Sequence, residues 1–263
     1  MRTRLRCRVL LWGLSLFITA SGAANAESAL RLEWPATLGT LSATTFDTNR
    51  VAVGAAHVMI ERLDDGNVRM RSDSGFAEGA RTVVSALLEP VDAGRSLRPV
   101  HQESRSFDEE RQPLGRLEIN HRERMARCYT PELKKSGEIA LPENDRVANM
   151  TLSFLFLPLV RKEREKLDFQ IFLCGLGMRV VDFDAVLAPE SRDGAKPHLV
   201  EVRYGPDLGL ANFIAPAFLP KLSFWYAREA PHSWMAHRLP LYGRGPVVFV
   251  VRDGVPLDWL GER

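Results

Sequence analysis

The fold is set by residues 222–252, LSFWYAREAPHSWMAHRLPLYGRGPVVFVVR, which contain two clear β-strand patterns. The first pattern covers residues 222–229. Leu222, Phe224 and Tyr226 alternate there with the residues at 223, 225 and 227, which belong to the other face of the strand. A period of two residues is typical of a strand whose two faces meet different surroundings. We therefore expect one face of this strand to be apolar and aromatic.

The second pattern, residues 247–251, is apolar throughout and mostly β-branched, as in a strand that is buried on both faces. A shorter strand is expected at 233–238. Such strands need a large sheet to pair with. The upstream chain is therefore expected to provide that sheet.

Upstream, apolar alternation recurs at short intervals between turn sequences. Asp64-Asp65-Gly66 separates two strand-like segments and predicts a hairpin. Residues 27–49 are expected to form an ordered loop or one short strand. The remaining expected strands lie at 51–63, 67–72, 80–88, 97–107, 114–121, 124–130, 167–173, 181–187 and 198–204. This spacing predicts a mainly β fold, with a curled antiparallel sheet or an incomplete β-barrel.

The central segment 145–160 breaks this rhythm. Asp145 is placed to cap a helix whose apolar residues share one face, and Pro158 followed by RKEREK is placed to end it. The same segment is apolar enough for a buried strand. We expect one central helix, with the strand as the alternative.

The first 26 residues have the features of a secretory signal peptide. Four arginines precede a short apolar run, and Ala24-Asn25-Ala26 provides a small-residue cleavage site. About ten apolar residues are too few to span ~30 Å of hydrocarbon, so a retained membrane anchor is not expected. We expect cleavage after Ala26, a periplasmic location, and a single β-rich domain over residues 27–263 with no integral membrane span.

Charge does not favour nucleic acid as a partner. The full chain has a formal net charge of +2, and loss of the four N-terminal arginines changes it to −2. A basic domain would be the electrostatic signature of nucleic-acid binding. The basicity of this chain belongs to its export signal.

Two cysteines remain after processing, Cys128 and Cys174. In an oxidising compartment an even pair favours a disulfide. The alternative is two buried thiols that do not meet, since free cysteine is often a core residue.

Common catalytic and phosphate-binding motifs are missing, and the six histidines are scattered along the chain. Asp182 and Asp184 share one face of a predicted strand, where they form either paired carboxylates or a solvated face. We assign no catalytic residue, no metal site and no cofactor.

The most informative cluster is aromatic and consists of Phe224, Trp225, Tyr226 and Trp234. We expect Leu222, Phe224 and Tyr226 to face the concave side of the sheet, where they either fill the core or line a pocket for an apolar ligand. Trp225 must then point the opposite way. It would need cover from the central helix or from the C-terminal segment around Trp259.

The order of these elements resembles a family of uncharacterised exported envelope proteins of bacteria. The resemblance rests on the segment after Asp145, on the strands LDFQIFLCG and HLVEVRY, and on KLSFWYARE at 221–229. It implies a curled antiparallel barrel. The chain is also loosely similar to the half-barrels of periplasmic lipoprotein and lipid carriers, in which a curved sheet and a helix enclose an apolar cavity.

The sequence thus predicts a non-catalytic envelope protein that binds an apolar ligand, such as a lipid, or a lipidated or hydrophobic partner segment. Two alternatives remain open. One is an exported hydrolase in which His and Asp residues converge, and the other is an envelope assembly factor without a small-molecule ligand.

Overall fold

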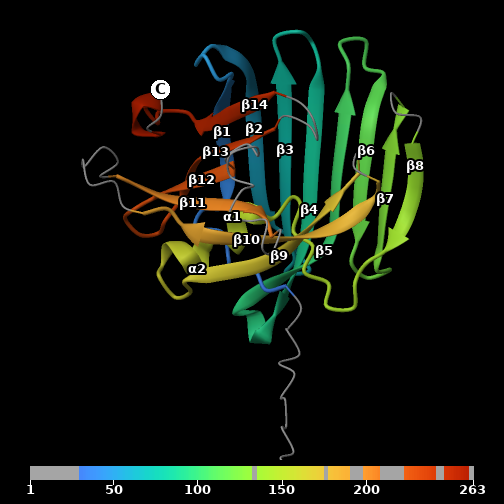
Figure 1. The fold of residues 1–263 in the computed structure, drawn as a ribbon. Coiled ribbons are helices and arrows are strands. Elements are labelled where there is room, and N and C mark those ends of the chain that lie inside the picture. The colour runs from blue at the N-terminus through green and yellow to red at the C-terminus, as the bar shows by residue number, and fades with distance from the viewer. Residues whose placement is uncertain are drawn as a thin grey trace, which may run out of the picture.

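A computed structural model describes residues 30–131, 135–174, 177–189, 198–207, 222–240 and 246–260 (Figure 1). Within these residues, 14 strands form one antiparallel sheet. The strands are β1 (Gly39–Phe46), β2 (Ala52–Arg62), β3 (Val68–Phe76), β4 (Arg81–Val91), β5 (Ser96–Phe107), β6 (Pro113–Asn120), β7 (Met125–Thr130), β8 (Lys135–Ala140), β9 (Lys166–Leu173), β10 (Arg179–Leu187), β11 (Leu199–Pro206), β12 (Leu222–Ala227), β13 (Trp234–Pro240) and β14 (Val247–Arg252). The expected mainly β fold with a curled sheet is confirmed.

The strands follow one another as hairpins with a single exception. The order across the sheet is β8-β7-β6-β5-β4-β3-β2-β1-β14-β13-β12-β11-β10-β9. Only β1 and β14 pair without being consecutive in the chain, with Ala43 opposite Arg252. The hairpin predicted at Asp64-Asp65-Gly66 is present, and Gly66 adopts a positive φ of 84° that favours glycine.

The two ends of the sheet overlap instead of pairing edge to edge. Phe172 on β9 and Val180 on β10 pack with Ile119 on β6 and Ala126 on β7. In Figure 1 the ends of β9 and β10 accordingly reach across the sheet toward β7. The curl is therefore held by side-chain packing where a closed barrel would use a β-ladder.

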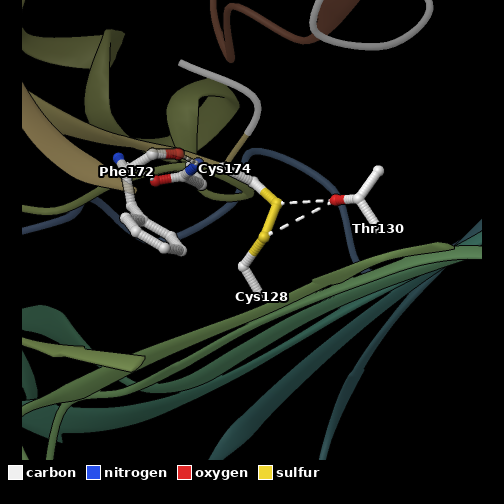
Figure 2. Close-up of a disulfide and its surroundings, with 5 residues drawn as sticks. Cys128, Thr130, Phe172 and Cys174 are labelled. Atoms are coloured by element: carbon white, nitrogen blue, oxygen red, sulfur yellow. Dashed lines mark hydrogen bonds between the residues drawn. A yellow bond between two sulfur atoms is a disulfide. The ribbon is translucent and has the colours of Figure 1, made fainter. Parts of the chain in front are cut away.

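A disulfide fastens this overlap. Cys128 on β7 is bonded to Cys174, which directly follows β9, and their Cα atoms are 5.8 Å apart (Figure 2). The hydroxyl of Thr130 lies 3.0 Å from the sulfur of Cys174. The predicted pairing of Cys128 with Cys174 is present in the structure.

The segment before the central helix seals the remaining gap. Val147 forms a parallel bridge with Gln170 of β9, and the Asn149 side chain pairs with both backbone groups of Phe172, at 2.8 and 2.9 Å. On the other side, the buried amide of Gln102 on β5 donates to the carbonyl of Val147 at 3.0 Å and accepts from the backbone N–H of Met150 at 2.8 Å. These side-chain amides imitate the ladder that the sheet lacks here.

The central helix consists of two short turns, α1 (Leu152–Leu155) and α2 (Leu157–Val160), inside the curl. Seven of the buried core residues belong to these turns or to the junction between them: Leu152, Phe154, Leu155, Phe156, Leu157, Leu159 and Val160. The expectation of one central helix is confirmed, and α2 ends at Val160, directly before RKEREK as expected, but the expected start at Asp145 and the expected role of Pro158 are wrong. No residue caps α1 with its side chain, and Asp145 instead binds His121. Pro158 lies within the first turn of α2, where its missing N–H costs nothing.

The outer face carries a smaller core. Trp225, Leu199 and Val251 pack there beneath the C-terminal 3-10 turn η5 (Leu257–Leu260). The expected cover over Trp225 is thus provided by the C-terminal segment. No helix of the described residues is long and apolar enough to cross a bilayer.

The expected signal peptide at 1–26 lies outside the described residues. β1 was expected only as a possible short strand, and β8 was not expected at all. Both are short or rich in Thr, Ser and Gly, so their apolar alternation is weak.

Candidate ligand cavity

The concave face of the sheet encloses a cavity of about 360 Å³, between β1–β5, β12–β14 and α1. This volume lies in the range of small-molecule sites, ~300–1,000 Å³. The residues that line it include apolar side chains from the sheet and from the central helix, such as Ile60, Met70, Leu152, Leu157 and Val250.

Small side chains make room for this cavity. On the strands β1 to β5, Thr45, Ala56, Ser74, Thr82 and Ser104 all line it. Ala56 pairs across the sheet with Ala43 on one side and with Ser74 on the other, so three consecutive strands present small residues in one row. Because none of these side chains reaches the centre of the curl, the space between the wall and α1 stays open.

The opposite wall is aromatic. Phe224 is 5 % exposed, and its ring centroid lies 5.4 Å from that of Phe156 between α1 and α2. Tyr226 is 1 % exposed, and its hydroxyl donates a hydrogen bond to the carbonyl of Ser153 at 3.0 Å. This bond fixes the position of α1 against β12. The aromatic strand therefore supports the helix and forms one side of the cavity at once.

Of the three residues assigned to ligand binding from the sequence, Phe224 and Tyr226 line the cavity. Leu222 packs against the same core cluster but is not among the lining residues. All three lie on the concave side, as the alternation predicts. Whether they bind a ligand stays a prediction.

Histidine and tyrosine side chains in this wall are held in their neutral forms. Burial lowers the pKa of His237 on β13 to about 4. Burial also raises the pKa of Tyr204 and of Tyr226, so both phenols keep their protons at neutral pH. His237 packs on Phe224 with ring centroids 5.1 Å apart. These groups behave as part of an apolar wall.

Trp234 at the start of β13, a member of the aromatic cluster seen in the sequence, also lines the cavity, and so does Arg252 at the end of β14, which sequence analysis did not single out. Alternation along β14 places Val248, Val250 and Arg252 on the concave face. Alternation along the strand could have placed Arg252 on the concave face from the sequence alone. A charged residue at the end of an apolar strand, however, is ordinarily expected to point into solvent. The cavity becomes visible only once the sheet curls.

Within the described residues, His121 and Asp145 form a His–Asp pair that is not part of the lining of this cavity. The Nδ1 atom of His121 lies 2.9 Å from the carboxylate of Asp145, and its Nε2 atom lies 2.7 Å from the amide nitrogen of Gln102. Because an amide nitrogen only donates, Nε2 accepts, and the proton on Nδ1 is donated to Asp145. Both ring nitrogens are engaged in this buried network. It attaches the segment before α1 to β5 and leaves no nitrogen to activate a water molecule.

The paired acids Asp182 and Asp184 likewise have structural partners. Asp182 accepts a hydrogen bond from Gln170 at 3.0 Å, and Asp184 forms an ion pair with Lys166 at 3.2 Å. Among the described residues, no three His, Cys, Asp or Glu side chains gather in a way that would hold a metal ion.

No protein-family model matches this sequence, and no curated protein matches it. Among solved structures, the chain is similar to a β-barrel-like protein of a domain of unknown function, DUF1849, from Brucella abortus. The two share 9 % sequence identity, with a TM-score of 0.43 over 86 % of this chain and 96 % of the other. A likeness this distant carries no inference about the present chain.

Proposed function

We propose that this protein is a non-catalytic binding protein of the bacterial envelope. It is exported to the periplasm, loses residues 1–26, and holds an apolar ligand, or the lipidated or hydrophobic segment of a partner, inside its curled sheet. The observation that supports this proposal is the cavity of about 360 Å³ with its largely apolar lining.

An unfilled apolar cavity costs free energy, and an apolar ligand can recover it. Water gains few hydrogen bonds against Ile60, Met70 or Leu157, whereas an apolar ligand buries their surface at about 25 cal/mol per Å². A chain that needed only stability would fill this space with larger side chains at positions such as Ala56. The hollow wall therefore favours binding.

The hydrolase alternative has no comparable support, because the one buried His–Asp pair uses both histidine nitrogens internally. An assembly factor without a small-molecule ligand is distinguished from a ligand carrier by the experiment below.

The test purifies the full chain from bacterial periplasm and analyses a chloroform extract by mass spectrometry. A lipid or other apolar molecule is expected at close to one equivalent. N-terminal sequencing of the same sample should begin at Glu27.

The matched variants are Ala56→Leu, which places bulk in the cavity, and Ala55→Leu, which places the same bulk on the exposed outer face of β2. Ala56→Leu should lose most of the bound molecule while keeping its melting temperature, and Ala55→Leu should retain it. An empty wild-type protein, or equal retention by both variants, would contradict the proposal.

A further inference from the structure

We infer that the cavity selects amphiphiles with one apolar chain and an anionic head group, and that Arg252 and Trp234 bind the head. This inference rests on the proposed function and adds the chemical class of the ligand. The shared chemistry is a carboxylate or phosphate head, as in a fatty acid or a single-chain phospholipid.

Among the described residues that line the cavity, Arg252 is the only arginine or lysine. No acidic residue is among the residues that line the cavity, and its two histidines include His237, whose low pKa keeps it neutral. Within the described residues, the Arg252 guanidinium makes no hydrogen bond or ion pair. An arginine keeps its charge at any physiological pH, so this cation stands beside apolar walls without a counter-ion.

Trp234 supplies a second donor at the same place. Its indole Nε1 is buried and has no acceptor among the described residues. Ala236 pairs with Val251, and β13 bulges against β12 between Trp234 and Ala236, so Trp234 and Arg252 both lie beyond the Ala236–Val251 pair at the same end of the two strands. Both residues line the cavity.

The buried indole N–H of Trp234 and the half-buried guanidinium of Arg252 both lack an acceptor among the described residues. A buried donor that lacks its partner loses the hydrogen bonds it had in water, and a carboxylate or phosphate restores them with charge assistance. A neutral head group satisfies the indole but not the guanidinium. The pair is therefore selective for an anion.

The same register gives the direction of the tail. Arg252 stands in one row with Ala43, Ala56 and Ser74, whereas Ile60 and Met70 lie further along the strands. Ile60 lies four positions after Ala56 on β2, which is roughly 13 Å of strand. An apolar chain from the head therefore runs toward Ile60, Met70 and α1.

The experiment uses the delipidated full-length mature protein and calorimetric titration with dodecanoate, dodecyl phosphate and dodecanol at neutral pH. The wild type should bind at least one anion about tenfold tighter than dodecanol, as expected for one charge-assisted contact. The stronger of the two anions identifies a carboxylate or a phosphate head. Arg252→Met should remove this preference and leave dodecanol affinity within about twofold.

Two further variants make the result decisive. Trp234→Phe keeps an aromatic ring but removes the Nε1–H donor. It should lower the affinity for the anion by a few-fold and leave the affinity for dodecanol unchanged. This variant also tests the inference if Arg252→Met does not fold. The control variant is Arg203→Met. Arg203 is not among the residues that line the cavity, and its guanidinium forms an ion pair with Glu201 at 3.0 Å, so this variant should keep the preference for the anion.

Equal binding of all three ligands by the wild type, or a preference that survives Arg252→Met and Trp234→Phe, would overturn the inference while leaving the proposed function intact. Failure to bind dodecanol and both anions would instead overturn the proposed function itself.

Discussion

The two halves of the sheet present concave walls of opposite character, although they are built from the same alternation. On β9 to β12 the inward residues are large and aromatic, namely Phe169, Phe183, Tyr204, Phe224 and Tyr226. On β1 to β5 several are small or carry hydroxyls, such as Thr45, Ala56, Ser74 and Thr82. The aromatic half is filled, and the other half is hollow.

The difference teaches that the volume of the inward side chains, and not the curl, determines where the cavity lies. Phe156 stands at the centre of the filled half, with its ring centroid 5.4 Å from those of Tyr204 and Phe224 and 5.6 Å from that of Phe169. Edge and tilted contacts of this kind add to the free energy gained by burial. The filled half holds α1 and α2, and the hollow half faces them across open space.

Truncation of Phe156 should have the largest effect on this comparison. Phe156 is fully buried, so Phe156→Ala should lower the free energy of unfolding by about 3–5 kcal/mol through lost contacts and a new void. Val84→Ala, on the hollow wall, should cost about 1 kcal/mol or less, because that side chain already borders open space. Urea denaturation of both variants measures this. Losses of similar size would mean that the two halves are equally packed.

Removal of the disulfide should separate the closure of the curl from the cavity. The bond joins residues that are 46 positions apart. By restricting the unfolded chain, it should raise the free energy of unfolding by at most about 4 kcal/mol. The double variant Cys128→Ala/Cys174→Ala should therefore melt at a lower temperature. Because neither cysteine lines the cavity, its retention of bound apolar molecules below that temperature should match the wild type. Loss of both properties together would show that the cavity depends on the overlap.

Low pH should reduce the stability of the fold through His237, which lies on β13 between the two concave walls. Burial lowers the pKa of His237 from 6.5 to about 4, so the unfolded chain takes up this proton at a higher pH than the folded one. Stability is complete above pH 6.5 and falls as pH decreases toward 4, by up to ~3 kcal/mol. The variant His237→Gln should lack this part of the acid dependence. Parallel pH profiles for the two proteins would show that His237 is not buried in the neutral form.

Local patterns explain what the sequence could predict. Apolar alternation and turn residues are properties of neighbouring positions, so most strands, the Asp64-Asp65-Gly66 hairpin and the opposite orientations of Phe224 and Trp225 followed from them. The cysteine pair followed from number and compartment.

What the sequence could not predict depends on distant contacts. Asp145 has the chemistry of a helix cap, but His121 offers it a partner from a different hairpin. The pairing of β1 with β14 joins the two ends of the described chain, and no local pattern encodes it. Arg252 and Trp234 acquire their significance only from that pairing and from the curl.

The single pairing between non-consecutive strands has a consequence for how the chain folds. Every other pairing among the described strands joins strands that are consecutive in the chain, whereas β1 and β14 bring Ala43 to Arg252 from opposite ends of the described chain. Hairpins form early because they cost little loop entropy, and the long closure costs more. Two independent meanders therefore precede one late joining step. Since the cavity has walls from both meanders, it exists only after that step, and a chain stalled before it exposes both inner faces to solvent.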